Sequence, residues 1–159
     1  MSEEPIEIKF DKQEVIDKIL ELAKRGENLR PLMKNIAGVF ADSTEDNFAE
    51  EGRPDKWTEL SQVTKDLRKE TGNWPGQILQ VSGQLASSIT TYYDDDSAII
   101  GSNLKYAAIH QLGGQAGRNK KVTIPARPYL KLTDDDYAEI LDNVEKHLIK
   151  NTSRNEQIF

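Results

Sequence analysis

Hydrophobic residues recur every three or four positions in three stretches of the chain, which predicts three amphipathic helices. The first helix follows Asp11 and ends at Gly26, and the second follows Asn28 and ends near Gly52. Thr133 is placed to cap the third. The apolar positions are Val15, Ile16, Ile19, Leu20 and Ala23 in the first helix; Leu29, Leu32, Met33, Ile36, Val39, Phe40 and Phe48 in the second; and Tyr137, Ile140, Leu141, Val144 and Leu148 in the third.

Alternation of apolar and polar residues predicts β-strands in other parts of the chain. Residues 6–10 alternate strictly and predict a half-buried strand. Residues 90–93 and 97–101 flank the acidic turn Asp94-Asp95-Asp96, and this arrangement predicts a β-hairpin. A short helix over residues 83–89 is expected just before it.

The polar residues of the second helix follow Phe40, and we expect the run 42–47 to face solvent on its outer side. The segment 55–76 is also polar and is interrupted by glycine and proline. We expect Trp57 and Leu60 to hold its beginning against the body, a short helix near residues 64–71, and a mobile tip at residues 65–75.

We expect the other helices and strands to pack around the stretch 99–130. A short apolar segment, residues 106–112, stops at Gly113-Gly114, where positive φ is accessible. A basic loop of residues 115–121 follows, and the chain returns through Pro125-Ala126-Arg127-Pro128, which is held out of any helix by its two prolines.

Together these elements predict an α+β fold, with a small antiparallel sheet packed with several α-helices and long mobile loops. We expect one domain over residues 1–150, in which residues 1–26 supply a strand and a helix, and a frayed polar tail over residues 151–159. A sheet this small leaves an edge open, and an open edge is a docking surface in a protein that assembles.

Composition narrows the classes of function. A net charge of −6 over 159 residues opposes general binding of nucleic acid, which needs a basic face. The chain has no cysteine, so disulfides and thiolate metal sites are excluded. No apolar run approaches the length of a membrane span, and the acidic start MSEEPIEIKF lacks the pattern of a signal peptide, so residence in the cytosol is expected.

The candidate chemical groups do not form a catalytic or metal-binding set. His110 lies in an apolar run with no nucleophile or acid at a familiar spacing, which favours a packing role. The triplets Asp94–Asp96 and Asp134–Asp136 lack the pattern of a calcium loop. The glycine-rich basic loop 113–121 lacks a phosphate-binding pattern. We therefore expect no catalytic residue, cofactor or metal.

An ordered set of short motifs resembles one known family. The motifs are Trp57 with Leu60 and Thr64, LQVSGQL at 79–85 with Ser88-Ile89, IGSN at 100–103, YAAIHQLGG at 106–114, and IPARPYL at 124–130, followed by an acidic helix. This order resembles the phage virion morphogenesis proteins, the Mu-like G proteins, which are related to the tail-completion proteins of contractile-tailed phages. The resemblance covers about residues 57–148 and is less clear over residues 1–26.

The resemblance implies a non-enzymatic structural protein that acts in tail completion or head–tail joining. It implies assembly in the bacterial cytoplasm, a place in the virion tail or neck, a homo-oligomer such as a ring, and contacts with other tail or neck proteins but not with a membrane. The expected contact residues are Gly113, Gly114, Arg118, Lys120, Lys121, Arg127 and Tyr129. Two alternatives stay open: a nucleic-acid-binding accessory factor that uses the basic loop 117–121, and a hydrolase that uses His110.

Overall fold

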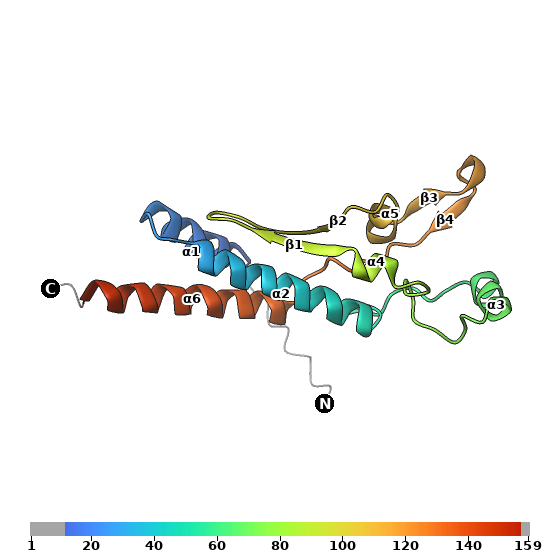
Figure 1. Ribbon diagram of the computed structural model, residues 1–159, viewed down its shortest axis with the longest axis horizontal. Coiled ribbons are helices and arrows are strands. Elements are labelled where there is room, and N and C mark those ends of the chain that lie inside the picture. Colours follow the sequence, from blue (N-terminus) through green and yellow to red (C-terminus); the bar gives the residue numbers. More distant parts are fainter. Residues whose placement is uncertain (1–11, 157–159) are drawn as a thin grey trace, which may run out of the picture.

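The protein is elongated, with a helical body at one end and a smaller loop-rich part at the other (Figure 1). The computed structural model describes residues 12–156, and side chains up to residue 153. The predicted strand at residues 6–10 lies outside the described residues. The described elements are helices and two antiparallel hairpins, which confirms the α+β prediction.

Three helices form the body: α1 (Lys12–Lys24), α2 (Arg30–Ala49) and α6 (Asp134–Glu156). Helices α1 and α2 both pack against α6, and the hairpin formed by β1 (Ile89–Tyr93) and β2 (Ala98–Ser102) packs against α2. Their shared apolar core comprises Val15, Leu22, Leu29, Leu32, Met33, Ile36, Val39, Ile140 and Val144. The apolar spacing of all three helices therefore predicts their existence correctly.

Helix α1 presents apolar residues on two faces. Val15 and Leu22, seven positions apart, are buried against the core, and Ile19 packs beside them. Ile16 and Leu20, which we expected in the same stripe, are 49% and 52% exposed. The predicted stripe is thus wider than the face that the protomer covers, because a helix that packs on one neighbour buries only a narrow strip.

The polar run of α2 does not face solvent throughout, which corrects the prediction. Ser43, Thr44 and Asn47 are buried, and they lie on the face of α2 that continues the apolar stripe by one or two turns. Their spacing is helical, but because they are polar the sequence pattern does not predict that they are buried. The hydrogen bonds that make this burial tolerable are described with the site.

The β1–β2 hairpin has the predicted position, with Tyr92 opposite Ile99. The turn is closed by the Asp94 carboxylate, which accepts hydrogen bonds from the Asp96 and Ser97 amides and from the Ser97 hydroxyl. These bonds, led by the Asp96 amide, lower the pKa of Asp94 to about 2. The predicted helix before the hairpin is shorter than expected: α4 is Gln84–Ser87, and Ile89 already belongs to β1.

The loop-rich end has its own small core, made by Phe48, Trp57, Ile78, Leu85, Ala107 and Tyr129. Around it lie α3 (Gln62–Glu70), α5 (Ala107–Leu112) and a second hairpin. Ser61 caps α3 through the Thr64 amide, so this helix begins two residues earlier than predicted. Trp57 is buried and Leu60 packs against it, as expected, whereas the mobility of residues 65–75 stays a prediction.

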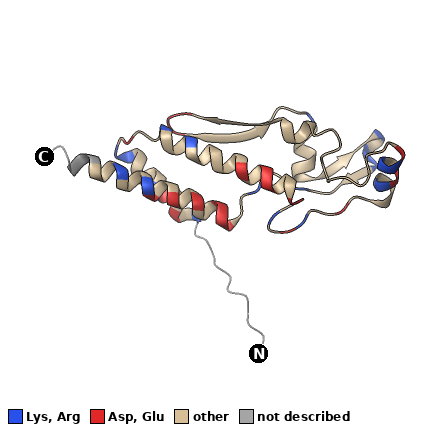
Figure 2. Ribbon diagram, turned by 60° about the horizontal axis from the view of Figure 1, so that its bottom comes forward, with Lys and Arg blue, Asp and Glu red and all other residues tan. Residues whose placement is uncertain are grey.

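Helix α6 is longer than predicted. It continues from Leu148 to Glu156, so residues 151–156, which we expected in a frayed tail, are helical. Asn151 donates to the Glu27 carboxylate and thereby ties this extension to the connection between α1 and α2. At the other end of α6, acidic positions of α6 and α2 lie close together, and basic and acidic positions both occur at the loop-rich end (Figure 2).

Candidate functional site

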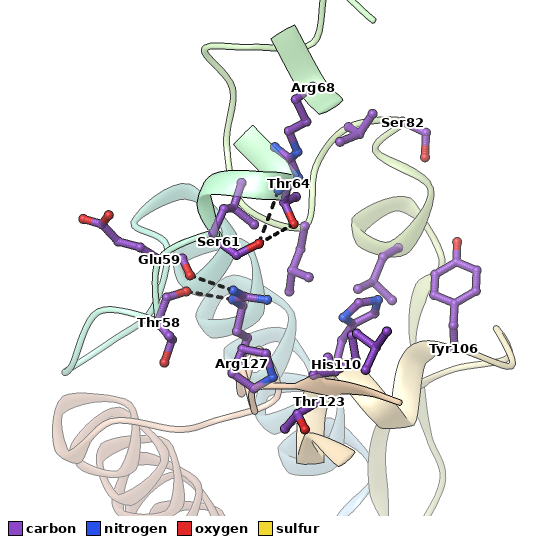
Figure 3. A pocket seen from close by; sticks show the side chains of 17 residues that line it. Thr58, Glu59, Ser61, Thr64, Arg68, Ser82, Tyr106, His110, Thr123 and Arg127 are labelled. Carbon is purple, nitrogen blue, oxygen red and sulfur yellow. Dashed lines mark hydrogen bonds between the residues drawn. The ribbon is translucent and has the colours of Figure 1, made fainter. Parts of the chain in front are cut away.

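Arg127 fixes the position of the 124–130 segment from inside the loop-rich end. Its side chain is buried, and its Nε and Nη2 atoms donate to the carbonyl oxygens of Thr58 and Glu59 at 2.9 and 3.1 Å (Figure 3). Its amide donates to the His110 carbonyl at 2.8 Å. Because both prolines hold this segment extended, its polar groups point sideways and meet partners from distant parts of the chain.

A pocket of about 620 Å³ lies beside Arg127, between the beginning of α3, the Leu79–Leu85 segment and the return strand (Figure 3). Its apolar lining includes Leu60, Leu79, Val81, Leu85, Tyr106 and Val122. Arg68, which lines it as well, donates to the Gln77 carbonyl. Polar side chains, among them Thr58, Ser61 and Thr64, line it as well, so the pocket offers both apolar surface and hydrogen-bonding groups.

His110 borders this pocket from α5, but nothing orients it for catalysis. Its Nδ1 atom is buried and has no hydrogen-bond partner in the described structure. Tyr106 lies edge-on to the ring, with the centroids 6.0 Å apart. Burial lowers the pKa of His110 from its ordinary value, and the positive charge of Arg127 lowers it further. A neutral, unoriented imidazole supports the predicted packing role.

We expect His110 to make the protein less stable in mild acid. Its pKa is lowered on folding, so the unfolded chain binds the proton more tightly, and stability is lost as the pH falls from about 6.5 through the folded-state pKa. The measurement is the melting temperature between pH 8 and pH 5 for the wild type and for His110→Gln. The variant should lose less stability on acidification, because it has no imidazole to protonate. Parallel curves for the two proteins would contradict this assignment.

Tyr129 is the most enclosed large side chain of the loop-rich end, at 1% exposure. Its hydroxyl donates to the Ala107 carbonyl at 2.6 Å, and its ring stacks on Phe48 with the centroids 5.3 Å apart. Burial raises the pKa of Tyr129. The amides of Tyr129 and Leu130 both donate to the Gln111 side-chain oxygen, at 3.0 and 2.9 Å. Helix α5 and the 124–130 segment are therefore joined by both side-chain and backbone groups.

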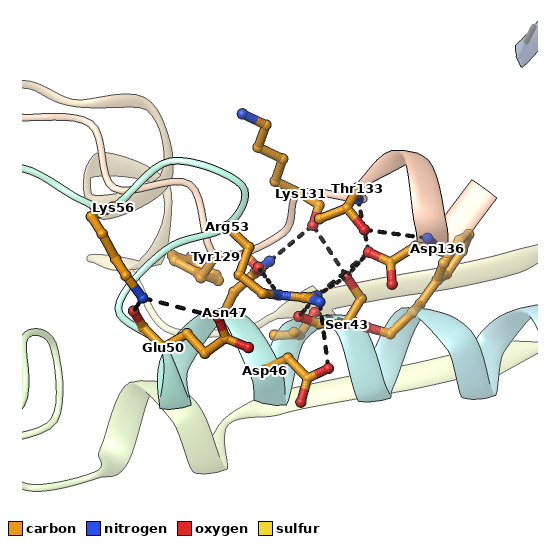
Figure 4. Close-up of polar contacts among 12 residues, drawn as sticks. Ser43, Asp46, Asn47, Glu50, Arg53, Lys56, Tyr129, Lys131, Thr133 and Asp136 are labelled. Atoms are coloured by element: carbon orange, nitrogen blue, oxygen red, sulfur yellow. Dashed lines mark hydrogen bonds and ion pairs between the residues drawn. The ribbon is translucent and has the colours of Figure 1, made fainter. Parts of the chain in front are cut away.

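Helix α2 holds the same segment from the other side (Figure 4). The Asn47 amide nitrogen donates to the carbonyls of Tyr129 and Lys131, at 2.8 and 2.9 Å. The Trp57 indole nitrogen donates to the Pro128 carbonyl at 3.0 Å. We call residues 124–130 with these partners the clamp. It satisfies the backbone of an extended segment that pairs with a strand only at Ile124.

A second polar cluster continues from the clamp to the start of α6 (Figure 4). The Asp136 carboxylate accepts from the Ser43 hydroxyl at 2.6 Å and from the Thr133 amide at 2.7 Å. Arg53 lies 3.5 Å from Asp136 and also donates to the Asn47 side-chain oxygen. Asp136 is therefore a buried capping residue in the first turn of α6.

Gly113 makes the sharp stop that the sequence predicts. It has φ +72°, and a Cβ atom built there would lie 2.8 Å from the Ala126 amide nitrogen. Any other residue would push the 124–130 segment away from α5. Gly113 thus serves the clamp, and contact between this residue and a second subunit stays a prediction.

The basic loop contains regular secondary structure. It is a second hairpin, in which β3 (Gly114–Ala116) pairs with β4 (Val122–Ile124), and a 3₁₀ turn, η1 (Arg118–Lys120), forms the tip. We call the unit β3–η1–β4 the basic hairpin. Arg118, Lys120 and Lys121 are exposed, and no ion pair to them occurs among the described residues. The tip therefore carries three cations for which the described residues offer no counter-charge.

The seven predicted contact residues fall into two groups. Gly113, Gly114 and the three cations lie in or beside the basic hairpin, where contact with a partner stays a prediction. Arg127 and Tyr129 are 6% and 1% exposed and are engaged inside the protomer, so the structure corrects their role to one in the fold. The sequence missed Asn47 and Gln111, although Gln111 stands inside the motif YAAIHQLGG.

No group of three or more metal-ligating side chains occurs among the described residues. Within the same part of the chain, none of the helices combines the length and the apolar character needed to cross a bilayer.

The comparisons with known proteins point to phage assembly. Mu-like prophage FluMu G protein 2 of Haemophilus influenzae is 41% identical over 143 residues, which are 89% of this chain and 95% of the relative. Putative capsid assembly protein G of Escherichia phage Mu is 38% identical over 123 residues, which are 75% and 79% of the two chains. No solved structure matches. The profile of the phage virion morphogenesis family matches residues 10–149, and the chain belongs to that family.

Proposed function

We propose that the protein is a non-enzymatic structural subunit that acts in tail completion or head–tail joining of a phage or prophage. In this proposal it works by self-assembly and by contacts with other tail or neck proteins. It is made in the bacterial cytoplasm and then becomes part of the virion tail or neck. One observation supports the proposal most: the polar groups of the family motifs make hydrogen bonds inside the protomer, in the clamp.

The motif residues are arranged for shape and not for reaction. Arg127, Tyr129 and Gln111 each bond to backbone groups of the protomer. A catalytic site instead needs polar groups aimed at a position where a substrate can lie. Residues that lock a loop-rich end into one shape suit a subunit whose surface must match a neighbour.

The surface of the loop-rich end also suits contact with other proteins. Large apolar side chains are exposed on several of its elements: Val63, Leu67, Val81, Tyr106, Leu112 and Val122. Contiguous exposed apolar surface marks sites of protein contact. The basic hairpin projects from this same end (Figure 1) and adds the exposed Arg118, Lys120 and Lys121 to it.

The relatives agree with a role in assembly at a coarser level. The phage Mu relative is described as a putative capsid assembly protein, and the family is defined by virion morphogenesis. We take both as support for an assembly role in this chain. The assignment to the tail or neck rests on our proposal alone.

One second candidate has an observation in its favour. The three cations of the basic hairpin have no counter-charge among the described residues, so they could contact nucleic acid as an accessory factor would. Binding of DNA that weakens steeply with salt, and that is lost when Arg118, Lys120 and Lys121 become alanine, would favour this candidate. For a hydrolase that uses His110, no contact of the ring offers support.

The test in solution is whether the purified protein forms a closed oligomer. Light scattering gives the mass of the particle, and electron microscopy shows whether it is a ring. Hydrogen exchange, compared between protomer and assembly, should show stronger protection of residues 113–121 in the assembly. A protein that stays monomeric at every concentration tried, or equal protection of the hairpin in both states, would count against self-assembly through this surface.

A further inference from the structure

The β1–β2 hairpin has an open edge on its β1 side. The Asp94 amide donates to the Ser97 carbonyl across the turn, so the backbone groups of Tyr92, two residues back, also point toward β2. The backbone groups of Thr91 and Tyr93 point the other way, where β1 has no partner strand among the described residues. No hydrogen bond to these outward groups occurs within the same part of the chain. An edge of this kind is a template for another extended segment.

A groove of about 350 Å³ lies along this edge, between β1 and α2. We call it the edge groove. Its apolar lining is mostly small and comprises Ala41, Phe48, Ala49, Ala86 and Ile89. Its polar lining comprises Thr44, Glu45, Gln77, Gln80 and Thr91. Apolar spaces beside free backbone groups suit an extended peptide, because such a peptide offers both apolar side chains and main-chain hydrogen bonds.

The length of the edge groove fits a short strand. Its lining on α2 runs from Ala41 to Ala49, which spans about 12 Å along the helix axis. A strand advances about 3.3 Å per residue, so four or five residues cover this distance. Ile89 and Tyr93 of β1 pack inward and Tyr92 is exposed, so an added strand would also have one inner and one outer face. The site therefore requires a segment of about five residues in which apolar and polar positions alternate.

Residues 6–10, which lie outside the described residues, have this pattern. We call them the arm. Their three apolar side chains alternate with Glu7 and Lys9. On the edge of β1, the apolar side chains would share the face that is turned to α2, and the two charged side chains would share the face that is turned to solvent. The other end of the chain outside the described residues, 157–159, is too short to cover the groove.

The edge groove and the start of α6 lie on opposite sides of α2. The Ser43 hydroxyl donates to Asp136 in the first turn of α6. Ala41 and Glu45, two positions before and after Ser43, line the edge groove instead. Side chains two positions apart on an α-helix point in nearly opposite directions. A segment that starts beside α6 must therefore pass around α2 to enter the groove of the same copy.

The arm starts on the α6 side and is too closely tethered to make that passage. The Lys12 ammonium lies 4.7 Å from the centroid of the Tyr137 ring, and α1 packs on α6. Only Asp11 separates Lys12 from the arm, so Phe10 stays within about 7 Å of Lys12. Helix α2 with its side chains is about 10–12 Å thick. An arm that lies along β1 must therefore come from another molecule.

We propose that the edge groove of one copy binds the arm of a second copy, which adds a strand to the open edge of β1. This inference rests on the self-assembly in the proposed function and names a contact that carries it. The arm and the groove are different surfaces, so the contact is heterologous. Such a contact repeats from copy to copy and forms a ring when the rotation between copies closes.

The first test variant removes the apolar face of the arm. It is Ile6→Ser with Ile8→Ser, which leaves the net charge unchanged. Its matched control is Glu7→Ser with Lys9→Ser, which alters the charged face of the same segment and also leaves the net charge unchanged. Only the first variant should lose assembly, because only the apolar face enters the groove.

The second test variant fills the edge groove. It is Ala49→Arg with Thr91→Arg, two exposed positions in the lining. Its matched control makes the same replacements at Ala138 and Thr90, which are exposed and lie outside the lining. Thr90 precedes Thr91 and therefore points to the other face of β1. Circular dichroism and melting verify that all four variants keep the fold, and each test variant by itself is able to contradict the inference.

Light scattering should show the same oligomer for the wild type and both controls, and a monomer for the arm variant and for the groove variant. An equal mixture of the arm and groove variants should give a dimer and nothing larger, because only one competent arm and one competent groove remain. Hydrogen exchange should show that the amides of Thr91 and Tyr93 are protected in the wild-type assembly and not in the arm variant.

Other outcomes overturn the inference in distinguishable ways. If the wild type assembles and either test variant assembles equally well, the contact is wrong while self-assembly stands. Normal assembly with a lowered melting temperature in both test variants would mean that the arm binds within its own copy. Loss of assembly in the controls as well, or a folded mixture that stays monomeric, also excludes this contact. A wild type that never assembles removes both this inference and the self-assembly on which it rests.

Discussion

Replacing Tyr129 with alanine should lower the free energy of unfolding by about 3–5 kcal/mol, the range typical of large aromatic side chains removed from a core. Tyr129 is 1% exposed and stacks on Phe48, so the substitution leaves a cavity between α2 and the 124–130 segment. It also leaves the Ala107 carbonyl without the hydroxyl that donates to it. Urea unfolding followed by tryptophan fluorescence measures the change, since Trp57 lies in the same core.

Two companion variants separate the causes. Tyr129→Phe keeps the ring and removes only the 2.6 Å hydrogen bond, so it should cost about 1–3 kcal/mol. Tyr92→Ala removes an exposed tyrosine and should change stability by about 0.5 kcal/mol or less. If Tyr129→Ala costs no more than Tyr92→Ala, the clamp is not the structural centre of the loop-rich end.

The long helices could be predicted because their apolar spacing matches the face that is buried. Val15 and Leu22 in α1, and Ile140 and Val144 in α6, share one core and follow helical periodicity. The β1–β2 hairpin was also predictable, since its strands favour extended backbone and an acidic turn separates them. In these elements the local signal and the tertiary contacts agree.

Buried polar residues are where the sequence pattern fails. Ser43 and Asn47 look like surface positions of α2, yet both are buried because partners far along the chain satisfy them. Those partners are Asp136 for Ser43 and the Tyr129 and Lys131 carbonyls for Asn47. A pattern of polarity records the residue type and not its partner, so such burial follows only from the tertiary structure.

The predicted contact residues also show that residue type does not reveal the partner of a side chain. The motif IPARPYL contains an arginine and a tyrosine, two residue types that are common at interfaces. Arg127 and Tyr129 instead face inward, because Thr58, Glu59 and Ala107 offer carbonyl acceptors there. The basic hairpin was expected as a loop, because its strands are only three residues long, which is too short for an apolar alternation to reveal them.

The clamp gives the family motifs a physical purpose. Segments near residues 47, 57 and 111 meet the 124–130 segment at one place, and each supplies a hydrogen bond that this segment lacks by itself. These hydrogen bonds hold the pocket beside Arg127 and the basic hairpin in fixed positions relative to each other. A subunit that must fit its neighbours benefits from that rigidity, because less ordering is left to be done on association.

The most direct measurement of the proposed function is the form of the particles made without this protein. In the phage or prophage that encodes the chain, its gene is deleted and the lysate is inspected by electron microscopy. We expect heads and tails that are separate or tails that are incomplete, with infectivity reduced by several orders of magnitude. The intact gene supplied in trans should restore joined particles, whereas a gene encoding Tyr129→Ala should restore fewer. Normal numbers of joined, infectious particles without the protein would contradict the account.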